Sequence, residues 1–92
     1  MYNILPYSYK EAKKLNVKIK PSKRKNKKID VYNKSNNYLL SIGDINYKDY
    51  PTFKNENGKQ FADKRRELYL NRHKKDKDVI GSKGYYASKI LW

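Results

Sequence analysis

The stretch that decides the fold is IDVYNKSNNYLLSI, residues 29–42. Its first four residues alternate apolar and polar side chains, which is the two-residue period of a strand with one buried face. The asparagine-rich segment 33–37 predicts a turn, because asparagine tolerates left-handed backbone conformations. Residues 38–42 then return as a second strand, so the stretch predicts a β-hairpin that ends at Gly43.

A third strand and a helix precede this hairpin. The segment VKIK at residues 17–20 alternates in the same way, and it is followed by Pro21, which cannot donate a hydrogen bond to a sheet. Ser8 and Glu11 have the spacing of a capping box, which predicts a short helix over residues 9–15. The sequence therefore predicts three antiparallel strands, at residues 17–20, 28–32 and 38–42.

Downstream of the hairpin the pattern becomes helical. Residues 43–58 mix glycine, proline and aromatic residues, and we interpret them as an irregular connection. Phe61 and Leu68 recur at helical spacing and predict the main helix over about residues 60–76. Ser82 is a candidate cap for a closing segment of one or two helical turns. The expected fold is α+β: a small antiparallel three-stranded sheet, one main helix packed on a face, and short terminal helical segments.

The chain is small and strongly basic. It has 92 residues, with 23 lysines and arginines against nine acidic residues, and its formal net charge is +14. This length predicts a single small domain with a modest core. Codons rich in A and T encode lysine, asparagine, isoleucine and tyrosine, so an AT-rich genome accounts for part of the charge. A charge of this size still attracts polyanions.

Composition argues against several kinds of site and location. With no cysteine and one histidine, we expect no disulfide, no structural metal and no cofactor. No apolar run approaches the roughly 18 residues that span a bilayer, and the N-terminus lacks the pattern of a secretory signal. We therefore expect no membrane partner and no small-molecule substrate.

The basic residues cluster ahead of the hairpin. Ten basic residues and one acidic residue lie between Lys10 and Lys28. Lysines bind phosphates and release counterions, but they are poorly suited to reading bases. This segment predicts sequence-independent binding of nucleic acid; the alternatives are an acidic protein surface as partner, or a solvated face in a lysine-rich chain. The candidate binding residues are Lys18, Lys20, Lys23, Arg24, Lys25, Lys27 and Lys28.

Three of the four arginines lie in the predicted main helix, at positions 65, 66 and 72. A small nuclease could use such a helix, with His73 as acid or base and Arg72 on the phosphate. However, no carboxylate is clearly placed to orient His73. An arginine on the apolar side of a helix, here Arg65 or Arg72, more often pairs with a carboxylate at the core edge, such as Asp44 or Asp49, or caps a tyrosine ring. We therefore expect a protein that is not an enzyme.

Four stretches of the chain resemble a short, uncharacterised protein family of giant nucleocytoplasmic DNA viruses and some large tailed phages. They are SYKEAKKL (8–15) running into IKPS (19–22), SIGD (41–44) with YKDYPT (47–52), RRELYLNRH (65–73) and GYYASKILW (84–92). The family offers no established chemistry to transfer residue by residue.

The resemblance implies a structural role in a virus particle. The protein would be a minor capsid or virion-associated component, present in the virion and in the host cytoplasm or nucleus during infection. Its basic arm would contact packaged nucleic acid, DNA or RNA, or an acidic capsid protein surface. The alternative is a free nucleic-acid-binding protein with an architectural or regulatory role. Exposed aromatic anchors carry interface energy, so the candidate docking residues are Tyr85, Tyr86 and Trp92, although Trp92 could equally fill the small core.

Overall fold

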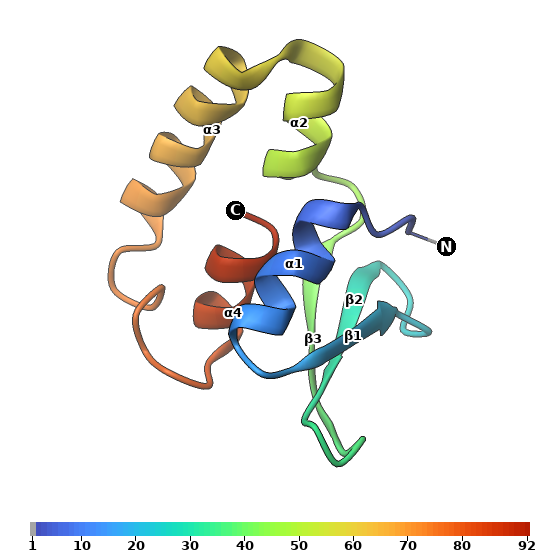
Figure 1. Cartoon of the computed structure of the whole chain (residues 1–92). Helices are drawn as coiled ribbons and strands as arrows, with labels where there is room; N and C mark the ends of the chain where they lie inside the picture. Colours follow the sequence, from blue (N-terminus) through green and yellow to red (C-terminus); the bar gives the residue numbers. More distant parts are fainter. Residues whose placement is uncertain (1) are drawn as a thin grey trace. The chain divides into compact units, whose positions relative to one another are not determined.

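The computed structural model describes residues 2–92, and these form three strands and four helices (Figure 1). The chain divides into two compact units, Met1–Tyr47 and Lys48–Trp92. The first contains α1 (Pro6–Lys14), β1 (Lys18–Pro21), β2 (Lys27–Tyr32) and β3 (Tyr38–Asp44); the second contains α2 (Tyr50–Asn57), α3 (Lys59–Arg72) and α4 (Lys83–Ile90). The predicted α+β class and the three-stranded antiparallel sheet are confirmed. The single-domain organisation stays a prediction.

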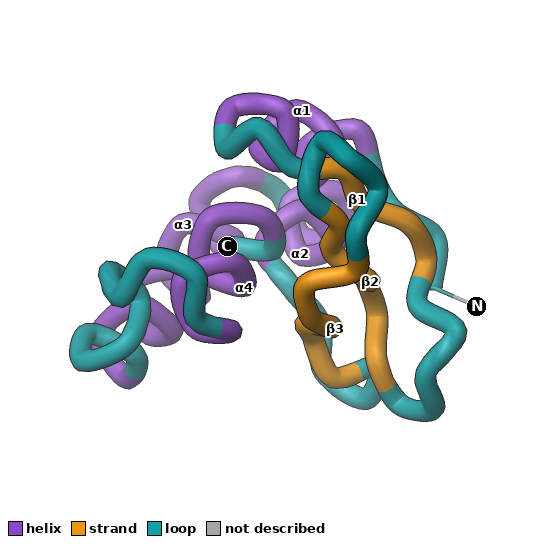
Figure 2. The backbone as a smooth tube through the Cα atoms, turned by 90° about the horizontal axis from the view of Figure 1, so that it is seen from below, coloured by secondary structure: helices purple, strands orange, loops and turns teal. Residues whose placement is uncertain are grey.

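The sheet has the strand order β1-β2-β3, with β2 in the centre (Figure 2). Its register pairs Ile19 with Val31 across β1 and β2, and Asp30 with Ser41 across β2 and β3. Alternation along each strand separates two faces. The buried apolar face contains Ile19, Ile29, Val31 and Ile42, and the opposite, polar face contains Lys18, Lys20, Asp30, Tyr32 and Ser41.

An irregularity in the sheet brings Tyr38 to the polar face. Val31 pairs with Leu40, but the next residue, Tyr32, pairs with Tyr38, so β3 contains one extra residue at this point. Without it, Tyr38 and Ser41 would lie on opposite faces, because they are three positions apart. A bulge of this kind re-aims the side chains that follow it. Tyr38 therefore lies beside Tyr32, and their ring centres are 5.9 Å apart.

Each connection in the first unit turns at an asparagine with positive φ. Asn16 lies between α1 and β1, Asn26 between β1 and β2, and Asn36 between β2 and β3, with φ values of 58°, 65° and 68°. Asparagine adopts this left-handed conformation more readily than other residues with a side chain. The prediction of a turn at residues 33–37 is confirmed in this way.

Helix α1 begins earlier than the sequence pattern indicates. It starts at Pro6, with Leu5 as the N-cap residue, and Ser8 is buried within the helix instead of capping it. Proline fits the first helical turn because its missing N–H has no intrahelical partner there. The predicted capping box and the predicted start at residue 9 are therefore wrong. The helix packs against β1.

Helix α2 replaces the irregular connection predicted for residues 43–58. The Asp49 side chain accepts a hydrogen bond from the Thr52 amide at 3.1 Å, and Pro51 lies in the first helical turn. Both are helix-start signals. Gly58, with φ of 89°, ends α2 and leads directly into α3, so that the two helices form a hairpin (Figure 1).

Helix α3 is shorter than predicted, since it ends at Arg72 and is followed by turns from His73 onward. Ala62 is its buried residue, whereas Phe61 and Leu68 are 45% and 48% exposed. The predicted apolar stripe is therefore not a buried face. Helix α3 packs against α2 in its own unit; its packing on a face of the sheet stays a prediction. The closing helix, α4, begins at the predicted Ser82 cap.

Candidate nucleic-acid interface

The basic loop between β1 and β2 is held by the buried carboxylate of Asp30. This residue lies on the central strand β2 and is 5% exposed. The hydroxyls of Ser22 and Ser41 each donate to its Oδ1 at 2.6 Å, and the backbone amide of Lys23 donates to Oδ2 at 3.3 Å. Because Ser22 directly follows β1 and Ser41 lies on β3, one carboxylate connects all three strands to the start of the loop.

The same contacts keep Asp30 charged. Burial alone raises the pKa of this carboxyl, but the hydrogen bonds from the two serine hydroxyls and the Lys23 amide, with the charge of Arg24, outweigh burial and lower the pKa below the ordinary 3.8. The carboxylate is therefore ionised at neutral pH. An ionised carboxylate holds hydroxyl and amide donors more strongly than a neutral acid does.

Arg24 extends this network across the polar face of the sheet. Its backbone amide donates to the Ser22 hydroxyl at 3.0 Å, and its Nη1 donates to the hydroxyl of Tyr38 at 3.2 Å. The Tyr38 hydroxyl lies 2.7 Å from Ser41 Oγ. Since the single proton of the Ser41 hydroxyl is donated to Asp30, Tyr38 is the donor in this contact. A continuous chain of hydrogen bonds thus connects the loop to β2 and β3.

The predicted binding residues differ in exposure. Lys27 is half-buried, and Lys28 is only 4% exposed. The Lys28 ammonium lies 5.3 Å from the centre of the Tyr2 ring. Because Lys28 lies on the central strand and is covered, it has no surface to offer a phosphate, and we remove it from the candidate interface. The exposed members are Lys18, Lys20, Lys23, Arg24 and Lys25.

Neutral partners fix the two lysines of β1. Lys18 Nζ donates to Asn36 Oδ1 at 3.0 Å, and Lys20 Nζ lies 5.4 Å from the centre of the Tyr32 ring. An amide and an aromatic ring orient an ammonium group without neutralising its charge. Both lysines are exposed on the polar face, as the alternation of residues 17–20 predicts.

The excess of positive charge is larger in the unit that carries this loop. Residues 1–47 contain eleven lysines and arginines and three acidic residues, a difference of +8, whereas residues 48–92 contain twelve and six, a difference of +6. In the second unit, lysines meet carboxylates directly, for example Lys48 with Glu56 at 2.6 Å and Lys59 with Asp63 at 2.7 Å. In the first unit, Lys14 meets Glu11 at 3.0 Å on α1, but Asp30, the acidic residue beneath the loop, accepts from hydroxyl and amide donors.

The arginines of α3 take part in packing. The Arg66 guanidinium lies 3.7 Å from the centre of the Tyr50 ring, and its Nε donates to the main-chain oxygen of Trp92 at 2.7 Å. Arg65 lies 5.3 Å from the centre of the Phe53 ring. A helix arginine therefore does cap a tyrosine ring, but it is Arg66 and not an arginine of the predicted apolar stripe.

His73 lies in a ring stack at the end of α3. Its ring centre is 4.2 Å from that of Tyr69. Its Nδ1 lies 3.5 Å from Asp76 Oδ1, so a carboxylate does face the imidazole, contrary to the sequence-based expectation. Burial, and next the charge of Asp76, raises the pKa of Tyr69. Arg72 is exposed. The nuclease hypothesis and the expectation of a non-enzyme both stay predictions.

The three aromatic residues predicted for docking lie near the end of the chain. Tyr85 and Tyr86 are half-buried on α4, with ring centres 5.3 Å apart. The Trp92 ring stacks on Tyr69 with centres 4.3 Å apart, and it lies 6.2 Å from Phe53. Trp92 therefore packs within its own unit, as its core alternative implied. The docking role of these residues stays a prediction.

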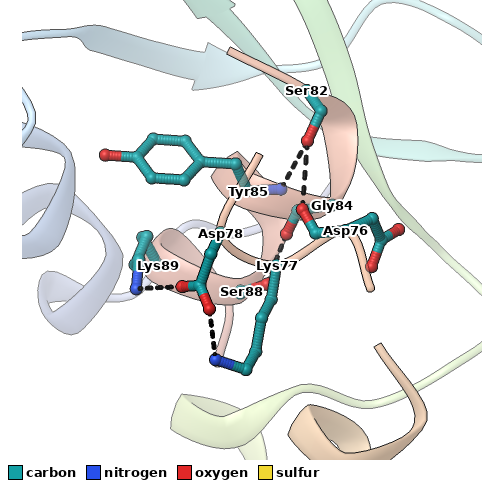
Figure 3. Close-up of polar contacts among 8 residues, drawn as sticks. All are labelled: Asp76, Lys77, Asp78, Ser82, Gly84, Tyr85, Ser88 and Lys89. Carbon is teal, nitrogen blue, oxygen red and sulfur yellow. Dashed lines mark hydrogen bonds and ion pairs between the residues drawn. The ribbon is translucent and has the colours of Figure 1, made fainter. Parts of the chain in front are cut away.

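Polar contacts fix the connection between α3 and α4 (Figure 3). Ser82 Oγ accepts from the Tyr85 amide at 3.1 Å and donates to the Asp76 carbonyl at 3.2 Å. The Ser88 hydroxyl donates to the carbonyl of Gly84. Gly84 lies so close to the Asp76 side chain that a Cβ at this position would collide with it. These contacts give the connection a structural role.

Three residues of the interface are not singled out by the sequence alone: Asp30, Tyr32 and Tyr38. The available signal is the isolation of Asp30, which is the one acidic residue among eight lysines and arginines in residues 18–43. In the structure this lone carboxylate holds Ser22 and the Lys23 amide at the start of the basic loop. The tyrosines gave no comparable signal, because the chain contains ten of them.

Comparison with protein-family models, with curated proteins and with solved structures finds no match for this chain. Within residues 2–92, no helix combines the length and the apolar character needed to cross a membrane. The same residues contain no group of three or more histidine or acidic side chains placed to hold a metal ion. The resemblance to a viral family, and the location and partners it implies, stay predictions.

Proposed function

We propose that the protein binds the phosphate backbone of nucleic acid without sequence preference. The binding surface, which we call the basic face, consists of Lys18, Lys20, Lys23, Arg24 and Lys25. The observation that supports this proposal is the buried Asp30 network, which holds the basic loop at the polar side of the sheet. Cations on an ordered loop lose less conformational entropy on binding than cations on a mobile one.

The composition of the basic face explains why sequence selectivity is not expected. Four of its five members are lysines, which act as point charges for phosphates. Base recognition in a duplex relies on planar side chains that bond two atoms of one base. The single arginine of the face, Arg24, already donates through Nη1 to Tyr38. The basic face is therefore suited to the backbone and not to the base edges of a duplex.

Salt dependence tests the proposal directly. If all five cations neutralise phosphates of duplex DNA, the affinity falls by about 500-fold between 50 mM and 200 mM salt. We expect the measured decrease to approach this value for several unrelated sequences alike. A decrease of less than about tenfold would contradict the proposal, because at most two cations would then contact phosphates.

A pair of triple variants separates the basic face from the general charge of the chain. The first variant changes Lys20, Lys23 and Lys25 to glutamine; the control changes three exposed lysines of the second unit, at positions 54, 64 and 74. Both remove three charges. The salt slope is the slope of log affinity against log salt concentration, and each phosphate-bound cation contributes about 0.7–0.9 to its magnitude. We expect the first variant to reduce this magnitude by about two to three, and the control variant to change it by less than about one. Equal losses would show that the net charge, and not this face, drives binding.

The setting that the resemblance implies is a virus particle, and we propose a non-enzymatic role there as a minor capsid or virion-associated component. The basic face would contact the packaged genome. Co-purification with virions at a fixed copy number supports this role. A protein found only outside particles, bound to nucleic acid, supports the free architectural or regulatory alternative.

A further inference from the structure

We infer that the basic face prefers single-stranded nucleic acid, because Tyr38 offers an aromatic ring on which an unpaired base can stack. This inference rests on the proposed function and names its substrate class. Base stacking on aromatic side chains is the usual means by which proteins hold single strands without reading their sequence.

Tyr38 is placed where a base can reach it. It is 47% exposed, although it lies within a strand. The extra residue in β3 brings it to the polar face, the same face that carries Lys18, Lys20 and Tyr32. Tyr32 supports it from the side, in an edge contact with an interplanar angle of 73°. The ammonium of Lys20 lies over the Tyr32 ring, so Tyr38 is the better platform of the two.

The Tyr38 ring is also held in one orientation before any ligand arrives. Its hydroxyl donates to Ser41 at 2.7 Å and accepts from Arg24 at 3.2 Å, and Ser41 in turn donates to the buried Asp30. A ring fixed at both its edge and its hydroxyl loses little conformational freedom on binding. The network that orders the basic loop therefore orders the ring as well.

Cations and ring together distinguish a single strand from a duplex. A flexible strand can place a base on Tyr38 while its neighbouring phosphates reach Arg24 and Lys20. The bases of a duplex are already stacked on one another, and removing one from the stack costs a few kcal/mol. A duplex can therefore use the cations of the basic face but not its ring.

The test compares an oligothymidylate, an abasic strand of the same length and a duplex of the same length, each titrated at fixed salt. We expect the oligothymidylate to bind at least about tenfold more tightly than the abasic strand, which has phosphates but no bases. Duplex binding by Tyr38→Ala is compared with that by Tyr38→Phe, since both lose the contact with Arg24, and the two should agree within about twofold. Tyr38→Ala should remove most of the oligothymidylate's advantage over the abasic strand. Tyr38→Phe, which keeps the ring and loses the hydroxyl, should keep most of it.

Fluorescence tests whether a base stacks at position 38 without relying on measured affinities. In a Trp92→Phe background, the indole introduced by Tyr38→Trp should lose fluorescence when the oligothymidylate is added, and not when the abasic strand is added. Circular dichroism confirms that each variant is folded.

The outcomes separate this inference from the proposed function. The stacking inference is wrong if the three probes bind alike and Tyr38→Ala does not change their affinities. Phosphate binding still stands in that case if the variant of Lys20, Lys23 and Lys25 weakens the binding of all three probes. If none of the probes binds at low salt, both are wrong.

Discussion

Replacing Asp30 with asparagine removes one negative charge from beneath the basic face and leaves the side-chain volume almost unchanged. Two hydrogen bonds from serine hydroxyls, each of 2.6 Å, then change from charge-assisted to neutral. Hydrogen bonds to charged groups contribute about 1.5–3 kcal/mol, and those between neutral groups about 0.5–1.5 kcal/mol. The change therefore costs roughly 1 kcal/mol per bond.

Two further effects act in opposite directions. The amide group of asparagine turns a donor toward the Lys23 N–H, which also donates, so this contact becomes unfavourable. Removing the charge relieves the cost of burying it, which offsets part of the loss. We expect the free energy of unfolding to fall by about 2 kcal/mol at neutral pH.

The pH dependence follows from the direction of the pKa shift. The pKa of Asp30 is lower in the folded protein than its ordinary value of 3.8. Its stabilising contribution is therefore fully present above about pH 4 and is lost as the pH falls through the folded-state pKa. The asparagine side chain of the variant does not titrate, so the difference in stability between the wild type and Asp30→Asn shrinks in acid.

Urea unfolding followed by circular dichroism at about pH 7 and pH 3 measures these differences. The matched control is Asp44→Asn, which removes the same charge from an exposed position on β3. It keeps an acceptor for the Asn46 amide, and we expect it to change stability by less than about 0.5 kcal/mol. Equal losses for the two variants, or a difference between wild type and Asp30→Asn that persists in acid, would refute the reasoning.

The same variant tests how the loop works. Asp30→Asn raises the net charge by one, so net charge alone predicts tighter binding of nucleic acid. If the carboxylate orders the basic face, binding weakens instead. We expect weaker binding.

Two predictions concern the second unit, and urea unfolding measures both. Arg66→Lys keeps the charge but loses the planar group over Tyr50 and the Nε donor to Trp92, so we expect a loss of about 1–2 kcal/mol. Gly84→Ala gains about 1 kcal/mol in helix propensity but drives a Cβ into the Asp76 side chain; we expect a net loss, which Asp76→Ala in the same chain reverses.

Arg65 provides the control for Arg66→Lys. Arg65→Lys alters a guanidinium that is exposed and lies farther from its ring, 5.3 Å from the centre of Phe53, so its effect should be smaller. A loss as large as that of Arg66→Lys would contradict the packing role assigned to Arg66. A Gly84→Ala protein more stable than the wild type would show that the Asp76 side chain moves away at little cost.

The strands were predictable because one face of the sheet is buried. Alternation around Ile19, Val31 and Ile42 placed all three strands to within one or two residues. Helix α2 was not predicted, although its Asp49 cap and Pro51 are local signals, because glycine and aromatic residues around them favoured a loop. Spacing favoured Arg65 over Arg66, because Arg65 continues the stripe of Phe61 and Leu68, whereas the actual choice depends on where the Tyr50 ring lies.

The candidate site was predictable only in part. The cations at positions 18–25 were found from their density, and the structure exposes them. The role of Asp30 depends on the register that brings Ser41 opposite it and on the loop that folds Ser22 onto it. The hairpin itself was predicted, but the register that pairs individual residues across it is not visible in a single sequence. Lys28 was misplaced for the same reason, because only the sheet shows that its strand is central.

The asparagines at the three turns of the first unit show how this fold is compatible with codons rich in A and T. Left-handed turns usually call for glycine, whose codons begin with two guanines, whereas asparagine is encoded by AAT and AAC. The chain has four glycines, and the turns at residues 16, 26 and 36 use asparagine instead. A drift of the genome toward A and T would thus enrich lysine on the surface and supply acceptable residues for the bends at the same time, so the hairpins could persist while the surface became more basic.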